Sequence, residues 1–152
     1  MTFRPATAKD LPFIVQLLAN DKFGRTREKF EEPLPPEYIE AFNNIAADKN
    51  QVLIVGESEH GEVIATLQLS FIQYLAFRGG IRAQIESVRI REDLRGKGIG
   101  QKMFQWTIDL AKKRKAHIIQ LTSDKRRPEA IRFYEKLGFV ASHEGMKLNL
   151  LK

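Results

Sequence analysis

The stretch from Ile99 to Arg114 constrains the fold of this chain more than any other part of the sequence. Its apolar residues recur every three to four positions and gather on one broad face of a helix. This apolar face comprises Ile99, Met103, Phe104, Trp106, Ile108, Leu110 and Ala111. The opposite face is polar, with Gln101, Lys102, Gln105, Asp109, Lys112 and Lys113. One broad apolar face is typical of a helix that packs on a sheet, so we expect a sheet beneath it.

The segments around this helix alternate between the periods of strands and helices. We expect strands at residues 3–5, 52–55, 63–76, 81–90, 118–121, 139–140 and 146–151. We expect further helices at residues 8–19, from Pro36 onward and at 128–137, and a two-residue hairpin turn at Gly79-Gly80. The order β-α-α-β-β-β-α-β-α-β-β predicts a mixed α/β fold with a central twisted sheet flanked by helices. The length of 152 residues predicts one domain over residues 1–152.

The composition excludes several kinds of chemistry. The chain has no cysteine, which removes disulfides, thiolate metal sites and a cysteine nucleophile. The three histidines, at positions 60, 117 and 143, lack the spacing of metal ligands, so we assign no metal. Ser87 and Ser123 lack the context of a hydrolase nucleophile. The N-terminus has no apolar signal core, and no stretch is long enough to span a bilayer, which predicts a cytoplasmic protein without a membrane partner.

The net charge of +6 indicates a polyanionic partner. Nucleic acid, an anionic membrane and a phosphorylated small molecule all fit this charge. The basic residues are spread along the chain, and no recognised nucleic-acid motif is present, which disfavours nucleic acid.

A glycine-rich segment follows the strand at 81–90 and precedes the long helix. It reads Arg95-Gly96-Lys97-Gly98-Ile99-Gly100. Glycines let backbone N–H groups converge, and a helix N-terminus adds the positive end of its dipole, so the segment favours a phosphate or pyrophosphate. The alternative is a tight turn that binds nothing. A P-loop needs GxxxxGK[ST], which is absent, and the spacing differs from the Rossmann GxGxxG pattern.

With this segment the chain resembles the GNAT superfamily of N-acetyltransferases, in its small single-domain bacterial type. The acetyl-CoA loop of that family has the pattern [RQ]-x-x-G-x-[GA], which residues 95–100 match. Residues 85–90 resemble the fourth strand of the family. Residues 130–139 resemble its second signature, a helix that ends in FY-x-x-x-GF. One departure is Arg127, where the family often has asparagine.

The resemblance implies an enzyme that transfers the acetyl group of acetyl-CoA to a primary amine by direct attack. It implies Glu86 as the base, directly or through water, and Tyr134 as the acid for the thiolate. The implied residues around acetyl-CoA are Val88, Arg89, Ile90, Arg95, Gly96, Lys97, Gly98, Ile99, Gly100 and Tyr134. The backbone of Val88 and Ile90 would pair with the pantetheine arm, and the Val88 N–H could face the thioester oxygen.

Each implied catalytic residue also has a purely structural interpretation. A glutamate within a strand is often solvent-facing or an ion-pair partner, which would explain Glu86. Tyr134 continues an apolar stripe, so packing alone would explain it. The amine acceptor is expected to lie against residues 21–35 and 73–80, with Phe23, Tyr74 and Glu86 as candidate contacts.

Two other functions remain open on the sequence. One is a sensor that binds acetyl-CoA without turnover, and the other is a basic nucleic-acid-binding module. The acceptor, a small-molecule amine or a protein amine, is not identified by any motif. A homodimer is compatible with the open edges of a mixed sheet, although no residue identifies the interface.

Overall fold

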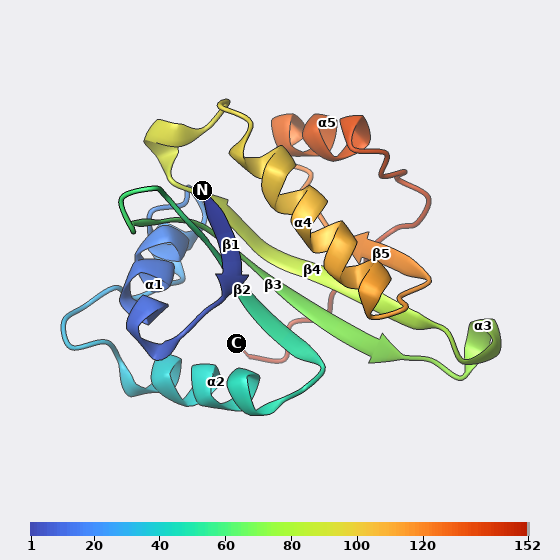
Figure 1. Cartoon of the computed structure of the whole chain (residues 1–152), viewed down its shortest axis with the longest axis horizontal. Coiled ribbons are helices and arrows are strands. Elements are labelled where there is room, and N and C mark those ends of the chain that lie inside the picture. Colours follow the sequence, from blue (N-terminus) through green and yellow to red (C-terminus); the bar gives the residue numbers. More distant parts are fainter. Residues whose placement is uncertain (152) are drawn as a thin grey trace. The chain divides into compact units, whose positions relative to one another are not determined.

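The computed structural model describes residues 1–151 and contains a mixed five-stranded sheet with helices on both faces (Figure 1). The chain forms two compact units, Met1–Gln120 and Leu121–Lys152. Within residues 1–151, no helix combines the length and the apolar composition needed to cross a membrane.

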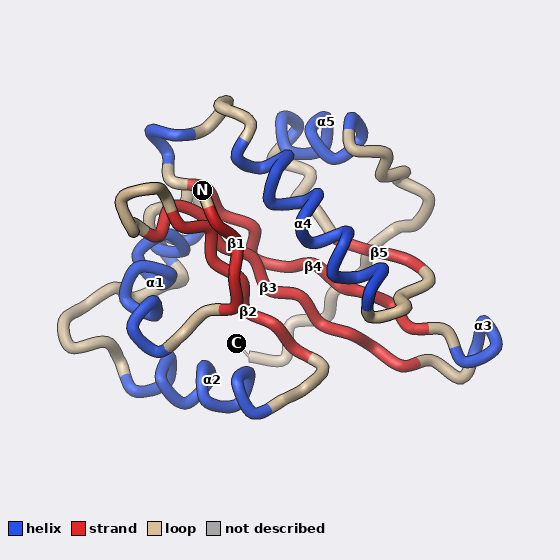
Figure 2. Tube along the Cα trace, in the orientation of Figure 1, coloured by secondary structure: helices blue, strands red, loops and turns tan. Residues whose placement is uncertain are grey.

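The strands are consecutive in the sheet, in the order β1-β2-β3-β4-β5 (Figure 2). They span Thr2–Pro5, Gln51–Glu57, Val63–Gln73, Ile81–Ile90 and Ile118–Leu121. The first four pair antiparallel with their neighbours. Because α4 connects β4 with its neighbour β5, these two strands run parallel and the sheet is mixed, as predicted.

The longer helices agree well with the predicted pattern. They span Leu11–Ala19 (α1), Pro36–Ala47 (α2), Ile99–Lys113 (α4) and Pro128–Lys136 (α5). The four-residue segment Ala76–Gly79 (α3) was not predicted, and Phe77 and Arg78 within it have left-handed φ values of 56° and 58°. Short 3₁₀ turns lie at Ala8–Asp10 (η1), Gly24–Thr26 (η2) and Glu92–Leu94 (η3). Proline stands in the first turn of α1, α2 and α5, where its missing N–H is not needed.

The two faces of the sheet in the first unit bear different helices. On one face, Leu53 of β2 packs against the cluster formed by Leu11, Val15 and Phe42 of α1 and α2. On the other face, Phe3 of β1 contacts Trp106 of α4, with 6.5 Å between ring centroids. The α1/α2 face and the α4 face are therefore opposite sides of one sheet.

Arg4 of β1 joins the start of the chain to β2. Its guanidinium donates to both carboxylate oxygens of Asp10, at 2.7 and 3.0 Å, and to Glu57 at 2.6 Å. The Thr7 backbone N–H also donates to Asp10, at 2.8 Å. Hydrogen bonds from Arg4, and then from Thr7, hold the pKa of Asp10 below its usual value.

The predicted two-residue turn at Gly79-Gly80 is wrong. Gln73 pairs with Ile81, so residues 74–80 connect the strands, and the predicted strand at 63–76 ends at Gln73. The Gln73 side-chain amide donates to the carbonyls of Tyr74 and Gly79, at 2.9 and 3.0 Å. These side-chain bonds satisfy backbone groups inside the connection, which favours a wide loop over a tight turn.

The two closing strands predicted at 139–140 and 146–151 are also wrong. The described residues 139–151 form no strand, and Met146, Leu148 and Leu150 are 85–93 % exposed. Backbone donors here bond locally, as the Leu151 N–H does with the Asn149 side chain. Alternating apolar residues form a strand only where a neighbouring strand supplies hydrogen bonds and a surface to cover them.

Candidate active site

The connection between β4 and α4 presents its backbone openly. Gly96 and Gly98 have φ values of 75° and 81°, which residues with a Cβ rarely adopt. Gly98 is the N-cap of α4, and no side chain in the described part of the chain caps it. A Cβ on either glycine would meet no atom within 4 Å. Uncapped N–H groups at the positive end of a helix dipole can donate to phosphate oxygens.

Strand β4 contains a bulge at Ser87. Gln68 and Thr66 of β3 lie two positions apart, but their partners Glu86 and Arg89 lie three apart. Ser87 has a φ of 56°, in the left-handed region, where the extra residue is inserted. Because of the bulge, Glu86 and Arg89 lie on the same face of the sheet, whereas a regular strand would place them on opposite faces.

The side chain of Arg89 forms a buried ion pair with Asp21, in the loop between α1 and α2. Its Nη2 lies 3.4 Å from Oδ2 of Asp21, and the two side chains are only 14 % and 3 % exposed. The same carboxylate oxygen accepts the backbone N–H of Phe23 and of Gly24. Nη1 of Arg89 donates to the Val88 carbonyl at 2.7 Å. The ion pair therefore ties the α1–α2 loop to β4 beside the bulge.

A second contact holds the other end of this loop. The Tyr38 hydroxyl of α2 donates to Glu28 at 3.1 Å and accepts the backbone N–H of Lys29 at 2.9 Å. Burial raises the pKa of Tyr38, and the neighbouring Glu28 acts in the same direction, so this hydroxyl remains a donor at neutral pH.

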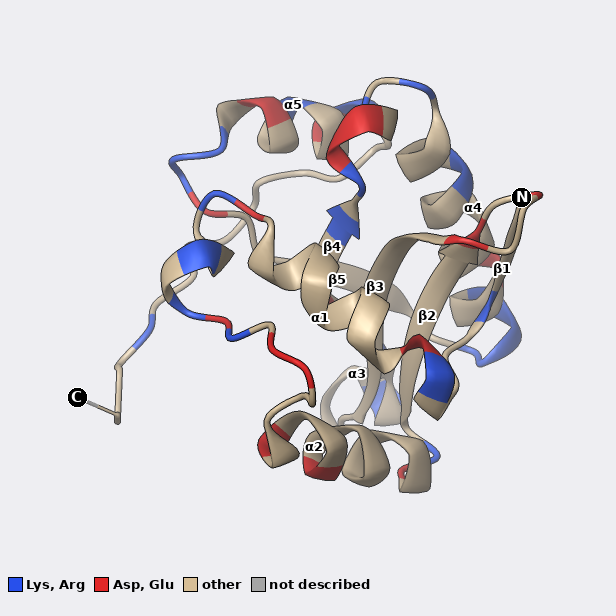
Figure 3. Cartoon of the chain, turned by 90° about the vertical axis from the view of Figure 1, so that its left-hand side faces the viewer, with Lys and Arg blue, Asp and Glu red and all other residues tan. Residues whose placement is uncertain are grey.

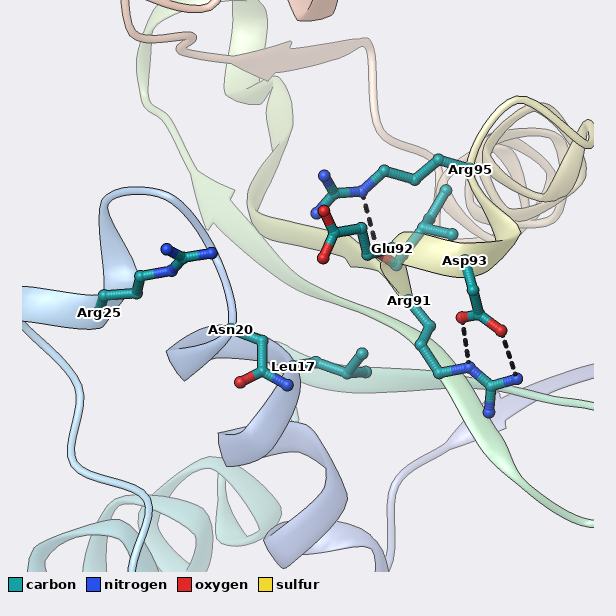
Figure 4. A pocket seen from close by; sticks show the side chains of 8 residues that line it. Leu17, Asn20, Arg25, Arg91, Glu92, Asp93 and Arg95 are labelled. Carbon is teal, nitrogen blue, oxygen red and sulfur yellow. Dashed lines mark hydrogen bonds and ion pairs between the residues drawn. The ribbon is translucent and has the colours of Figure 1, made fainter.

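A cavity of about 730 Å³ lies between the α1–α2 region and the end of β4 (Figure 4). It is lined by Leu17, Asn20, Arg25, Ile90, Arg91, Glu92, Asp93 and Arg95. In Figure 4 the Arg25 guanidinium and the Glu92 carboxylate point toward each other from opposite walls. The cavity reaches Arg95, where the glycine-rich connection begins.

The arginines around this cavity differ in their partners. Arg91 donates to both carboxylate oxygens of Asp93, at 2.7 and 3.2 Å, and these bonds lower the pKa of Asp93. Arg95 donates to the Ile90 carbonyl at 3.3 Å. Neither Arg25 nor Arg95 forms an ion pair with a described residue. The Glu92 carboxylate, which also forms no ion pair with a described residue, offsets one of these charges, so the cavity keeps a net positive charge for an anionic ligand.

Glu86, Phe23 and Tyr74 all belong to the first unit. Glu86 is exposed on β4, immediately before the bulge. Phe23 is half-buried in the loop that Asp21 holds. Tyr74 is half-buried in the 74–80 connection, and the Arg82 guanidinium lies over its ring at 4.7 Å. The ion pair between Asp21 and Arg89 joins the loop that contains Phe23 to β4, the strand that contains Glu86, whereas Tyr74 lies toward the hairpin end of β4.

Tyr134 lies on α5 in the second unit. Its ring packs edge-on against Phe133 and Phe139, with centroid separations of 5.5 and 6.0 Å. These contacts agree with the apolar stripe seen in the sequence, and the side chain is half-buried. Packing therefore orients this tyrosine within its own unit.

The sequence indicated residues 21–35 as part of the acceptor site, but it did not indicate what single residues of the α1–α2 loop do. Asp21 holds the loop, and Asn20 and Arg25 line the cavity. One signal for Asp21 was available in the sequence. Asp21 lies two residues before Phe23 and three before Gly24, a spacing at which an aspartate side chain often accepts backbone N–H groups in a turn. Its pairing with Arg89 was not visible, since it joins residues far apart in the chain.

Comparison with known proteins identifies relatives over most of the chain. The model of the acetyltransferase (GNAT) family matches residues 15–139. The L-methionine sulfoximine/L-methionine sulfone acetyltransferase of Pseudomonas aeruginosa is 29 % identical over 143 residues, which cover 93 % of this chain and 81 % of that protein.

Solved structures show the same fold. A protein of Bacillus halodurans C-125, described as a transcriptional regulator, superposes with a TM-score of 0.95 at 50 % identity, covering 98 % of this chain and 99 % of the other. A predicted acetyltransferase of Clostridium acetobutylicum, solved with acetyl-CoA, superposes with a TM-score of 0.75 at 27 % identity, covering 98 % and 96 %.

Proposed function

The chain belongs to the acetyltransferase (GNAT) family, as its sequence motifs predicted, and from this premise we propose that it acetylates the primary amine of a small molecule by direct attack on acetyl-CoA. Acetyl-CoA-dependent N-acetyl transfer is the activity of its family. The observation that carries the proposal is the uncapped, open N-terminus of α4 beside a cavity with unpaired cations.

The proposed cofactor contacts come mainly from backbone. The N–H groups of residues 96–100 bind the pyrophosphate, and Arg95 and Lys97 add positive charge. Val88, Arg89 and Ile90 offer backbone groups to the pantetheine arm, as an added strand would. The short length of β5 supports this assignment. β5 has four residues and begins opposite Ile81, because the His117 N–H just before it donates to the Ile81 carbonyl at 2.8 Å. The end of β4 therefore extends beyond its parallel neighbour.

The proposed chemistry uses three groups of the chain. Glu86 accepts a proton from the ammonium, directly or through water, because only the neutral amine is nucleophilic. The amine nitrogen then bonds to the thioester carbon while the carbon–sulfur bond breaks, and the nitrogen releases its surplus proton to water to give the neutral amide. The Val88 N–H, beside the bulge at Ser87, donates to the carbonyl oxygen as it gains charge. Tyr134 gives its proton to the departing thiolate.

The acceptor is proposed to enter beside the α1–α2 loop, near Phe23 and Glu86, with Tyr74 toward its far end. The relative from Pseudomonas aeruginosa is named for two amino-acid analogues, and it matches 93 % of this chain. An α-amino acid or a similar small amine is therefore the first acceptor class to test. The unpaired Arg25 would suit its carboxylate.

The cofactor site is tested by calorimetric titration with acetyl-CoA of the wild type, Gly98→Asp and Gly61→Asp. Gly61 is a matched control, since it has the same φ of 81° and also faces open space, but in the turn between β2 and β3. Both variants suffer the same backbone strain, but only Gly98→Asp adds a carboxylate beside the phosphates.

We expect Gly98→Asp to weaken acetyl-CoA binding by about 100-fold or more, since it places a like charge where the phosphates bind. Gly61→Asp should bind as the wild type does. Equal affinities in the two variants would show that the glycine-rich connection is only a turn. No binding by folded wild type would reject the proposal itself.

DNA binding is a second candidate, because the 50 % identical Bacillus halodurans protein is described as a transcriptional regulator and this chain carries a net charge of +6. Against it, lysine and arginine are scattered over strands, helices and loops and alternate with acidic residues (Figure 3). Salt-dependent retention on DNA, unaffected by saturating acetyl-CoA, would favour this candidate.

A further inference from the structure

One face of β4 carries a row of three polar side chains. Arg82, Gln84 and Glu86 alternate with Ala83 and Ile85, which are 0 % and 1 % exposed. A strand places such alternating residues on opposite faces, so the three polar residues share one face. We call Arg82, Gln84 and Glu86 the β4 row.

The β4 row lies on the α1/α2 face of the sheet. Glu86 pairs with Gln68, and Gln68 pairs with Leu53, which packs against the α1/α2 cluster. Residues opposite each other in adjacent strands share a face. Arg89 is on this face as well, because the bulge shifts its phase. The β4 row therefore lies on the same face of the sheet as Arg89, whose ion pair with Asp21 holds the α1–α2 loop.

The row presents three different chemistries at regular intervals. Alternate residues in a strand lie about 7 Å apart, so the row offers a carboxylate, then an amide, then a guanidinium, and the Cα atoms of Glu86 and Arg82 are about 13 Å apart. On β3, the residues paired with Gln84 and Arg82 are Ser70 and Ile72, neither of which is acidic. The sheet thus supplies no counter-charge for Arg82 from its neighbouring strand.

The guanidinium of Arg82 stacks on an aromatic ring but lacks hydrogen-bond acceptors among the described residues. It lies 4.7 Å from the centroid of the Tyr74 ring, and its Nε is buried with no hydrogen-bond acceptor among the described residues. No described acidic residue forms an ion pair with Arg82. Nη1 and Nη2 of Arg82 donate to no described residue either, and they are the atoms of the guanidinium that an anionic ligand can reach. A guanidinium that stacks on a ring and has no acidic partner suits a carboxylate.

We propose that Arg82 is a specificity-determining residue that binds an anionic group at the far end of the acceptor, while the acceptor's amine lies at Glu86. This inference rests on the proposed acetyl transfer. It adds a distal carboxylate or similar anion to the small amine proposed above, so the acceptor is elongated, and Gln84 faces the segment between its two ends.

The test compares two series of acceptors of equal length. One contains β-alanine, 4-aminobutyrate and 6-aminohexanoate, and the other contains the amino alcohols that replace each carboxylate with a hydroxymethyl group. Thiol release gives kcat/KM for the wild type, Arg82→Met, Arg82→Lys and Lys113→Met. Lys113 is an exposed cation at the end of α4, so its variant controls for a general change in charge.

We expect the wild type to prefer the longest amino carboxylate over its alcohol by about 10- to 100-fold, as a charged hydrogen bond gives. Arg82→Met should abolish this preference without changing acetyl-CoA affinity, Arg82→Lys should keep part of it, and Lys113→Met all of it. If no amine of either series is acetylated, the carboxylates are titrated into the acetyl-CoA-bound protein, where binding weakened by Arg82→Met supports the inference.

Equal use of carboxylates and alcohols by the wild type would overturn the inference about Arg82 but leave acetyl transfer intact. Retention of the preference in folded Arg82→Met would overturn it too, as would absence of any carboxylate binding in the titration. Failure of the wild type to bind acetyl-CoA would reject acetyl transfer and this inference with it.

Discussion

Arg89 of β4 and Asp21 of the α1–α2 loop form a buried ion pair, with 3.4 Å between Nη2 and Oδ2. The pair exists because a one-residue bulge at Ser87 turns Arg89 to the face that Glu86 occupies. The same feature thus positions the proposed base and fixes the loop that borders the cavity. Bulges often serve to re-aim side chains next to active sites.

Asp21→Asn is expected to lower the free energy of unfolding by about 3 kcal/mol, since it removes one partner of a buried pair and weakens the support of the loop. Urea denaturation measures the change. Asp93→Asn is the matched control, because Asp93 also pairs with an arginine but is exposed, and it should change stability little. Similar losses in the two variants would mean that burial adds nothing to the Asp21 pair.

Asp10 should make stability depend on pH in the acidic range. Arg4 lowers the pKa of Asp10 in the folded protein, so below its usual value of about 3.9 the unfolded chain binds more protons than the folded one. The contribution is complete above that value and is lost as pH falls through the folded pKa.

Urea denaturation between pH 2 and pH 7 compares the wild type with Asp10→Asn. The variant should be about 2 kcal/mol less stable at neutral pH, with the difference shrinking toward pH 2. Asp109→Asn is the control, since Asp109 is exposed and accepts from the Gln105 amide, with no arginine or lysine partner among residues 1–151. A difference that stays constant with pH would exclude the Arg4–Asp10 contact as its source.

Glu86→Gln should reduce kcat by about 100-fold, because the glutamine amide cannot accept the ammonium proton. Acetyl-CoA affinity should be unchanged. Glu40→Gln, at an exposed position of α2, controls for loss of one negative charge. Wild-type turnover in Glu86→Gln would assign the proton transfer to another group.

Tyr134→Phe should have a smaller effect, a loss of kcat of about tenfold, because a thiolate with a pKa near 8.5 leaves without full protonation. The phenylalanine ring keeps the contacts with Phe133 and Phe139, so the variant tests the hydroxyl group. Thiol release measures kcat. An unchanged kcat would leave Tyr134 with the packing role alone.

At position 78 a glycine substitution should leave the protein more stable than an alanine substitution, the reverse of the usual order of stability. Arg78 has a φ of 58° in the β3–β4 connection, a conformation that costs a residue with a Cβ about 1 kcal/mol or more. Arg78→Gly should therefore be more stable than Arg78→Ala in urea. At Lys102, an exposed position of α4, alanine should be the more stable by about 1 kcal/mol. The same order at both positions would contradict the left-handed conformation of Arg78.

The local elements were largely predictable from the sequence. The apolar face of residues 99–113, the glycine-rich connection before it and the strands at 81–90 and 118–121 were all identified correctly. Each of these elements depends on residues only a few positions apart, through the helical period, the alternation of a strand or the conformational freedom of glycine. A short stretch of sequence is therefore enough to predict it. The family motifs lie in these same windows, which is why the acetyltransferase class could be predicted.

Tertiary structure alone decided the features that join distant residues. The bulge at Ser87 depends on how β4 pairs with β3, and the pairing of Asp21 with Arg89 depends on that bulge. The strands expected at 139–140 and 146–151 failed for the same reason, since alternation states only that one side is apolar and not that a partner strand is present. The register of a strand and the identity of its partner strand depend on residues far apart in the sequence, so a local pattern cannot predict them.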